Sequence, residues 1–396
     1  MASIAEREAA VFLKTGARVP LTLVRGEGTR VWDDSGKEYL DFVAGISTDA
    51  LGHAHPAMLK AINEQAQQLI HVSNIFYTVP QVDLAELIVR ESGMAGVFFC
   101  NSGAEANEGA IKLARKWGRD HRNGAFEIIT AENAFHGRTL TTVTATGNPK
   151  YMDPFGPLPP GFVYVPYNDI DALRGAINEK TCAIMLEPVQ GEGGVNVPDP
   201  EYLPAVRKLC DDENILLMLD EIQTGMGRTG TMFGFQRYDF TPDIMTLAKG
   251  LGGGIPVAVI VANEKASVFE PGDHGTTFGG QPFATAVALA VAQTLVDEGI
   301  PQQAAEKGDH LQRRLRALED THPEVEGVRG QGLLVAVAFK NDIAAEVAAA
   351  ARDLGLLCNN VRPNAIRLMP PLTVSEAEID RAVEILGEAL TIVGDA

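Results

Sequence analysis

The sequence is poor in cysteine and in basic residues, and it contains no long apolar run. Its four cysteines form no Cys-x-x-Cys pair, a pattern typical of buried thiols in a reducing compartment. The net charge of −19 argues against a nucleic-acid partner, because such proteins displace counterions with a basic face. No apolar run approaches the ~18 residues of a membrane-spanning helix. The N-terminus also lacks an apolar signal-peptide core. We therefore expect a cytoplasmic protein without a membrane partner.

Motifs for nucleotide and metal binding are missing as well. The chain has no GxxxxGK[ST] segment and no GxGxxG after a predicted strand, which excludes a P-loop and a dinucleotide fingerprint. His53 and His55 lie in GHAHP without acidic or cysteine partners at ligand spacing, so we expect no metal. A small anionic ligand stays compatible with the acidic composition, since it needs only local arginines and helix N-termini.

The middle of the chain alternates between short apolar runs and helical patterns. Seven runs recur: VFFC (97–100), FEIIT (126–130), FVYV (162–165), CAIMLE (182–187), ILLMLD (215–220), DIMTLA (243–248) and VAVIVA (257–262). Continuous apolar strands that alternate with helices are typical of a mostly parallel sheet covered on both faces. The sequence therefore predicts an α/β fold with a large domain built around a mostly parallel seven-stranded sheet.

The two ends of the chain differ from the middle. Short strands are expected between residues 19 and 43, and alanine-rich helices at 282–298 and 302–319. A strand pair, GLLVAVAF and AIRLMPP, precedes a final amphipathic helix with Ser375 and Glu378 as a capping box. We expect both ends to share a smaller α+β domain. The expected boundaries are 1–62 for its N-terminal part, 63–285 for the large domain and 286–396 for its C-terminal part.

Polar residues follow the apolar runs at the points where the predicted strands end. These residues are Asn101-Ser102-Gly103-Ala104, Phe135-His136-Gly137-Arg138, Glu187, Asp220 and Lys249. Each has an ordinary explanation taken alone, such as a helix cap, a paired carboxylate or a solvated lysine. In a doubly wound sheet, however, ligands bind outside the carboxyl ends of the strands. We therefore expect these side chains to converge on one site.

The combination has a specific chemical meaning. A strand, a turn of small residues and a helix N-terminus together form a phosphate cradle. Lys249 at a neighbouring strand end can form a Schiff base with an aldehyde, and Asp220 can pair with a protonated ring nitrogen. A phosphate, an aldehyde and a pyridinium describe pyridoxal 5'-phosphate. The glycines of LAKGLGGG leave room around the lysine.

The sequence resembles the class III, fold-type-I pyridoxal-phosphate aminotransferases, and within them the bacterial acetylornithine aminotransferases. The motifs that carry this resemblance are YLDFVAGI, LGHAHP, NSGAEANEGAIKLAR, FHGRTL, YNDI, LEPVQGEGGV, LDEIQTGMGRTG, LAKGLGGGIP, HGTTFGGQP and RGQGLL. They follow one another in family order through nearly the whole chain. The resemblance implies the fold type I transferase architecture and a homodimer whose site lies at the subunit interface.

The resemblance also assigns roles around the cofactor. Lys249 is implied as the Schiff-base lysine and proton shuttle, Asp220 as the partner of the pyridine N–H, and Gln223 as a neighbour of the phenolic oxygen. Thr277 is similar to the residue that reaches the phosphate of the neighbouring subunit. The remaining cofactor residues implied are Ser102, Gly103 and Ala104 for the phosphate, with Phe135 and Ile222 on the two faces of the ring.

Substrate roles follow in the same way. Arg138 resembles the clamp for the α-carboxylate of an ω-amino acid, and Arg367 resembles the group that grips the α-carboxylate of glutamate. Glu187 is implied as a switch that pairs with Arg367 until glutamate arrives. Ile46 stands where ornithine aminotransferases usually have tyrosine, which favours an acylated amine. The implied reaction moves the ω-amino group of N2-acetyl-L-ornithine to 2-oxoglutarate and gives N-acetylglutamate 5-semialdehyde and glutamate, a step of arginine biosynthesis.

Several alternatives stay open at this point. Thr48-Asp49 stands where many relatives have Val-Asn, and Asp49 is expected near the substrate entrance, so the amine donor is open to question. Ornithine, succinylornithine, 4-aminobutyrate and carrier-linked lysine aminotransferases are related possibilities. An aminomutase, a decarboxylase and a non-catalytic binding protein are further ones, although the two arginines and the filled chemical positions argue against them.

Overall fold

A seven-stranded sheet forms the centre of the computed structural model, which describes residues 2–16 and 18–395. The strand order is β4-β10-β9-β8-β7-β5-β6, and only β10 runs against the direction of the others. The strands are β4 (Gly96–Cys100), β5 (Glu127–Ala131), β6 (Phe162–Val165), β7 (Thr181–Leu186), β8 (Leu216–Asp220), β9 (Ile244–Leu247) and β10 (Ala258–Ala262). Each overlaps one of the predicted apolar runs, which confirms the predicted α/β fold.

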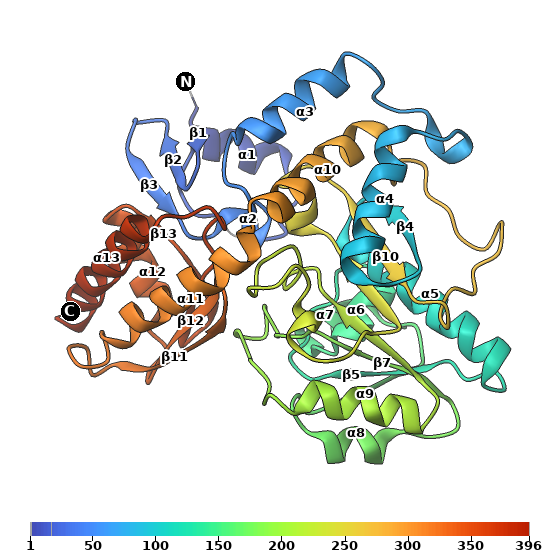
Figure 1. Cartoon of the computed structure of the whole chain (residues 1–396). Coiled ribbons are helices and arrows are strands. Elements are labelled where there is room, and N and C mark those ends of the chain that lie inside the picture. The colour runs from blue at the N-terminus through green and yellow to red at the C-terminus, as the bar shows by residue number, and fades with distance from the viewer. Residues whose placement is uncertain (1, 17, 396) are drawn as a thin grey trace.

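Helices cover both faces of this central sheet (Figure 1). In β8, Leu216 and Met218 pack into the cluster that includes α5 (Gly103–His121), whereas Leu217 and Leu219 pack into the larger cluster on the opposite face. Helices that contribute to this larger cluster include α4 (Val79–Ser92), α8 (Ile170–Ala176), α9 (Tyr202–Asp212) and α10 (Pro282–Asp297). Burial on both faces explains why the strands read as continuous apolar runs.

Two four-stranded sheets are built from the ends of the chain. The N-terminal sheet has the order β1-β2-β3-β13, and the C-terminal sheet has the order β11-β12-β15-β14. Their strands are β1 (Leu23–Glu27), β2 (Arg30–Asp33), β3 (Glu38–Asp41), β11 (Val325–Gln331), β12 (Leu334–Phe339), β13 (Leu356–Leu357), β14 (Asn359–Arg362) and β15 (Ala365–Leu368). The predicted strand pair is β12 with β15, which are antiparallel neighbours. The parallel strand β13 joins the two ends of the chain through β3.

The other helices are mostly short. They are α1 (Ile4–Val11), α2 (Ala44–Ser47), α3 (Pro56–Ala66), α6 (Leu140–Thr146), α7 (Pro149–Met152), α11 (Ile300–Arg316), α12 (Ala344–Asp353) and α13 (Glu376–Gly394), with 3-10 turns η1 (Ser73–Ile75), η2 (Asp153–Phe155), η3 (Gly234–Arg237) and η4 (Lys249–Leu251). Within the described residues no single helix is long and apolar enough to cross a membrane, although α10 and α11 pass such a test as a pair bent by 68°.

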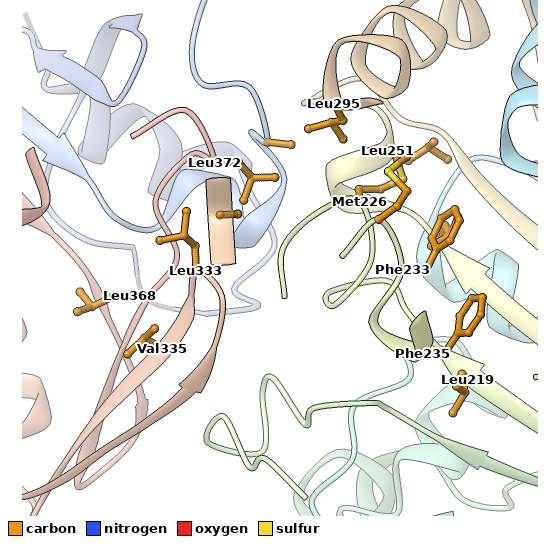
Figure 2. Packing of buried hydrophobic residues seen from close by; sticks show 14 of the residues in the cluster. Leu219, Met226, Phe233, Phe235, Leu251, Leu295, Leu333, Val335, Leu368 and Leu372 are labelled. Carbon is orange, nitrogen blue, oxygen red and sulfur yellow. The ribbon is translucent and has the colours of Figure 1, made fainter. Parts of the chain in front are cut away.

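One apolar cluster connects the central sheet with the C-terminal sheet (Figure 2). Leu219 of β8 and Phe233 belong to the same cluster as Val335 of β12 and Leu368 of β15. All four are essentially inaccessible to solvent. Since close-packed interiors resist relative movement, this cluster fixes β15 in relation to the carboxyl ends of the central strands.

The capping box predicted for the last helix is present. Ser375 Oγ accepts a hydrogen bond from the Glu378 amide (3.3 Å), and the Glu378 carboxylate accepts one from the Ser375 amide (3.0 Å). The helix α13 that it begins buries residues such as Ile379 and Leu386 against the core. The cap therefore lies at the start of a helix that unfolds only with the domain.

We expect Ser375→Ala to lower the free energy of unfolding by about 1 kcal/mol, because the first turn of α13 loses its side-chain acceptor. Chemical denaturation followed by circular dichroism measures this change. Ser3→Ala is the matched control, since Ser3 caps α1 in the same geometry but α1 buries none of its residues. An equal loss of stability in both variants would contradict the expectation.

Candidate active site

A cavity of about 430 Å³ lies at the carboxyl ends of the central strands. Most of the predicted site residues line it. They are Ser102, Gly103, Ala104, Phe135, Arg138, Glu187, Asp220, Ile222, Gln223 and Lys249. The cavity wall also includes Asn101 and His136, which lie in the predicted strand-end segments without an individual role, and Thr48, Glu192 and Gly254, which sequence analysis did not assign to a site. The predicted convergence on one edge of the sheet is therefore observed.

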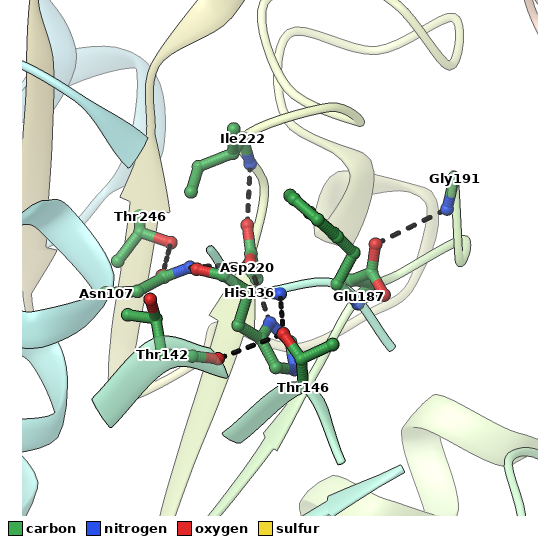
Figure 3. Close-up of polar contacts among 10 residues, drawn as sticks. Asn107, His136, Thr142, Thr146, Glu187, Gly191, Asp220, Ile222 and Thr246 are labelled. Atoms are coloured by element: carbon green, nitrogen blue, oxygen red, sulfur yellow. Dashed lines mark hydrogen bonds and ion pairs between the residues drawn. The ribbon is translucent and has the colours of Figure 1, made fainter. Parts of the chain in front are cut away.

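Asp220 is a buried carboxylate at the end of β8, held by several donors (Figure 3). Its Oδ2 accepts a hydrogen bond from Asn107 Nδ2 (2.8 Å) and lies 2.8 Å from His136 Nδ1. Its Oδ1 accepts from the Ile222 amide (3.1 Å). These contacts fix the carboxylate and leave one lone pair of Oδ1 for a partner in the cavity.

Asn107 is a functional candidate that sequence analysis missed, and His136 is one that it listed at a strand end without a role. Burial disfavours the imidazolium of His136, but the neighbouring Asp220 outweighs this effect and raises the His136 pKa above its usual value. Asn107 is itself oriented, because its Oδ1 accepts from Thr246 Oγ1 (2.8 Å). Asn107 lies one turn inside the NSGAEAN helix, and His136 directly follows Phe135. The sequence shows both residues inside these motifs, but it does not show that both side chains contact Asp220.

Glu187 lies deep in the site, with both carboxylate oxygens turned to backbone donors. It accepts hydrogen bonds from the amides of Phe135 (3.2 Å) and Gly191 (3.4 Å). Burial raises its pKa to about 8, and the negative charge of Asp220 acts in the same direction while His136 opposes it. Glu187 therefore holds a proton at neutral pH more readily than an ordinary glutamate does.

The expected ion pair between Glu187 and Arg367 is replaced by one with Glu192. Arg367 Nη1 donates to Glu192 Oε1 (2.6 Å) and to Gln223 Oε1 (3.1 Å). The chain after Glu187 folds into a tight turn, which brings Glu192 rather than Glu187 to the guanidinium. Arg367 overcomes the effect of burial and lowers the pKa of Glu192, which therefore stays ionised.

Arg367 itself is fully buried on β15. Its Nε and Nη2 find no hydrogen-bond partner among the described residues. A buried guanidinium with unused donors is costly unless an acceptor arrives, and a carboxylate matches its fork. Although Arg367 is not among the residues that line the cavity, it contacts Gln223 and Glu192, which are.

Lys249 follows β9 and begins the 3-10 turn η4 with a positive φ of 37°. Burial lowers its pKa, while the carboxylate of Glu192 acts in the opposite direction. Near neutral pH, an amine with a lowered pKa is deprotonated in a larger fraction of molecules and then has a free lone pair. It is thereby better suited to attack a carbonyl or accept a proton.

The segment predicted as a phosphate cradle forms the start of α5. Ser102 caps this 19-residue helix, its Oγ accepting from the Glu105 amide (3.3 Å). A β-carbon added to Gly103 would lie 2.8 Å from Ile222 Cδ1, so glycine lets these two segments approach without a shift of the Ile222 side chain. The first turn therefore offers free amide groups and the positive end of a helix dipole to an anion.

Three predicted residues lie at the edge of the site or outside it. Arg138 lines the cavity from an exposed position, with its guanidinium carbon 3.7 Å from the centre of the Tyr151 ring. Ile46 is 43% exposed and does not line the cavity; the nearby Thr48 does. Thr277 is exposed on a loop beyond the cavity.

The fold also gives His53 acidic neighbours that were not apparent from spacing. His53 Nε2 lies 2.9 Å from Asp41 Oδ2 and 4.0 Å from Asp49 Oδ2. The hydrogen bond with Asp41 raises the His53 pKa despite partial burial. Asp41 also accepts from the amides of Val43 and Ala44, so this group is accounted for as a structural ion pair at the start of α2.

Comparison with known proteins agrees with this geometry. The model of the family "Aminotransferase class-III" matches residues 12–390. The acetylornithine aminotransferase of Caldanaerobacter subterraneus subsp. tengcongensis is 51% identical over 96% of this chain and 97% of its own length. That of Methanothermobacter thermautotrophicus is 49% identical over 98% of each chain.

Solved structures agree as well. The ornithine aminotransferase of Toxoplasma gondii superposes with a TM-score of 0.95 at 34% identity, over 99% of this chain and 95% of that one. The acetylornithine aminotransferase of Elizabethkingia anophelis superposes with a TM-score of 0.88 at 35% identity, over 98% of each chain.

The chain belongs to the class III aminotransferases. Pyridoxal phosphate is the cofactor of this family, and the residues present fit it. The amine of Lys249 and the carboxylate of Asp220 line one cavity together with the helix N-terminus at Ser102. The set therefore offers a group for the aldehyde, one for the ring nitrogen and one for the phosphate.

We expect Glu187→Gln to change how stability depends on pH. Because the folded protein raises the pKa of Glu187, protonation stabilises the fold; this contribution is complete below pH ~4.5 and is lost as pH rises through about 8. Glutamine mimics the protonated form. The variant should therefore melt a few degrees above the wild type at pH 9 and close to it at pH 5, as measured by calorimetry.

Glu213→Gln is the control for this prediction, because Glu213 is an exposed residue after α9. A melting difference between Glu187→Gln and wild type that stayed constant from pH 5 to pH 9 would contradict the raised pKa.

Proposed function

We propose that the protein transfers the ω-amino group of N2-acetyl-L-ornithine to 2-oxoglutarate, giving N-acetylglutamate 5-semialdehyde and glutamate. The observation that carries the proposal is Arg367. Its guanidinium is buried, masked on one side by Glu192, and retains donors that no described group uses. A site that alternates between a substrate with one nearby carboxylate and a substrate with two requires such a maskable cation.

The chain's own residues divide the work around the cofactor. Pyridoxal phosphate supplies, when bound, a carbonyl that combines with amines and a ring that withdraws electrons. Lys249 Nζ would accept the proton that leaves the substrate carbon, and would then donate a proton to complete the transfer of the amino group. Asp220 would hold the ring nitrogen protonated, supported by His136 and Asn107. Gln223 would lie beside the phenolic oxygen.

The two carboxylate sites would be occupied in turn. Arg138, which lines the cavity from an exposed position, would bind the α-carboxylate of acetylornithine with its guanidinium held over Tyr151. During that half-reaction Glu192 would neutralise Arg367. When glutamate or 2-oxoglutarate enters, its α-carboxylate would displace Glu192 and take the free donors of Arg367. Glu187 keeps its backbone contacts in this scheme and is no longer needed as the switch.

One observation favours ornithine as a second candidate donor. The carboxylate of Asp49 lies next to Gly254, which lines the cavity; a β-carbon at Gly254 would be 3.3 Å from Asp49 Oδ1. A free α-ammonium would be attracted by this charge, whereas an acetylated nitrogen would not. The aliphatic Ile46 and the names of the relatives support the acylated donor.

We expect N-acetylornithine to be the best donor with 2-oxoglutarate as acceptor, ahead of ornithine, succinylornithine and 4-aminobutyrate. The measurement is kcat/KM for each donor, with glutamate formation quantified by chromatography. Lys249→Ala is the control for background amine exchange and should lower kcat by about a thousandfold or more, since it removes the proton-transfer group. A panel in which ornithine exceeded N-acetylornithine would overturn the proposed donor.

We also propose that the protein works as a homodimer with the site at the subunit interface. Large apolar side chains are exposed together on 69–79 and on the 276–281 loop. They are Leu69, Ile70, Ile75, Phe76, Tyr77, Val79 and Phe278. The two segments adjoin, because Asn74 Nδ2 donates to the carbonyls of Thr276 (3.0 Å) and Gly279 (2.9 Å). A patch of this kind marks a protein interface.

The patch also borders the cavity. Asn101, which lines the cavity, donates to Thr276 Oγ1 (3.3 Å). A second copy seated on the patch would bring its own 276–281 loop, with Thr277, close to this entrance if the interface is two-fold symmetric. This arrangement supports the expected role of Thr277 at the partner's phosphate.

We expect Ile75→Asp to convert the dimer into a 42.3 kDa monomer with little transaminase activity, because the charge would be buried in the interface. Light scattering coupled to size exclusion measures the mass. Ile392→Asp is the matched control, since Ile392 is 52% exposed on α13, away from the patch. An Ile75→Asp protein that stayed dimeric would place the interface elsewhere.

A further inference from the structure

Three arginines of the C-terminal sheet face one loop of the central domain. Arg329 of β11 pairs in register with Ala336 of β12, and Ala336 pairs with Arg367 of β15. Residues directly opposite one another on neighbouring strands point to the same face of a sheet. Arg329 and Arg367 therefore flank the small side chain of Ala336 on one face, which packs with Val189 and Val195 of the loop.

The loop is a closed structure rather than a free connection. Gln190 and Asn196 exchange both backbone hydrogen bonds (3.1 and 3.0 Å), so residues 190–196 form a ring with Glu192 inside it. Asn196 Nδ2 also donates to the Gly193 carbonyl (3.2 Å). A β-carbon on Gly193 would lie only 2.6 Å from the Asn133 carbonyl oxygen, so this part of the loop packs closely against the backbone at Asn133.

Two guanidinium groups hold the two peptide units that follow Glu192. Arg329 donates from Nε (2.9 Å) and Nη2 (2.7 Å) to the Gly194 carbonyl. Arg362 of β14 donates from Nε to the Gly193 carbonyl (2.8 Å) and from Nη2 to Asn133 Oδ1 (2.6 Å). The three arginines thus contact three consecutive residues of the loop, of which only Glu192 is contacted through its side chain.

We infer that Arg329 and Arg362 are positioning residues that set how firmly Glu192 masks Arg367, and so set the balance between the two carboxylate substrates. This inference rests on the proposed exchange of acetylornithine with glutamate. With the backbone at 193 and 194 fixed by charge-assisted bonds, Glu192 can leave Arg367 only by rotating its side chain. If the loop loses its contacts with Arg329 and Arg362, its backbone can move and carry Glu192 away from Arg367. The guanidinium of Arg367 is then free to bind a dicarboxylate.

The test uses glutarate, an unreactive dicarboxylate, and the cofactor-loaded enzyme. Arg329→Met keeps most of the side chain's length but removes both donors to Gly194. We expect glutarate to bind about fivefold tighter to this variant, measured by calorimetry, because loss of one charge-assisted contact weakens the mask by that order. The KM for N-acetylornithine should rise while kcat changes little. Arg329→Lys should restore part of the wild-type balance.

A double-mutant cycle separates positioning from general loosening of the fold. In a Glu192→Gln background the charged mask is gone, so adding Arg329→Met should leave glutarate affinity unchanged if Arg329 acts through Glu192. Arg381→Met is the control for loss of an arginine, because Arg381 is half exposed on α13 and forms ion pairs with Glu384 and Glu388. Its affinity for glutarate should match that of the wild type.

Unchanged or weaker glutarate binding in Arg329→Met, or the same fivefold gain with and without Glu192, would overturn the inference. Arg362→Met provides a second route to the same result should Arg329→Met fail to fold, and its expected outcome is identical. The proposed function is tested by a different result, because an enzyme that does not form glutamate from acetylornithine disproves the reaction. The double-mutant cycle on glutarate affinity tests the positioning role of Arg329 whatever amine donor the enzyme uses.

Discussion

The site depends on a charged carboxylate kept inside an apolar sheet. Asp220 ends a strand whose side chains are all buried, where a carboxylate without hydrogen-bond partners would be costly. Asn107 and His136 contact the same oxygen of Asp220, and each is held in turn by a residue outside the site, Thr246 and Thr146. The central strands, α5 and the turn after β5 must therefore all be in place for this one carboxylate to keep its partners.

The sequence was sufficient to predict the central sheet and most of the cavity wall, for a physical reason. Strands buried on both faces are continuous apolar runs, and the side chains that follow them meet at one edge whatever the loops do. Lys249, Asp220 and the Ser102 turn could be placed by this argument alone. Short edge strands such as β13 and β14 have no such signature, because their pattern is set by partners far along the chain.

The error at Glu187 shows where sequence reasoning failed. Glu187 and Glu192 lie in one motif, and both are acidic residues after β7. Which of them reaches Arg367 is decided by the closed turn between Gln190 and Asn196, whose shape depends on contacts with a different sheet. Spacing along a strand predicts a position at its end. It does not predict how a following loop is folded against the strand of Arg367, which lies 175 residues after Glu192.

The pairing of β13 with β3 has a consequence for synthesis of the chain. The central sheet closes once β10 has been made, since β4 and β9 both pair with that strand. The N-terminal sheet cannot be completed at that stage, because its fourth strand begins only at Leu356, close to the end of the 396 residues. On the ribosome β1, β2 and β3 thus emerge before the central strands but are among the last to acquire their full set of neighbours. The exposed edge of β3 would need shielding from other nascent chains until then.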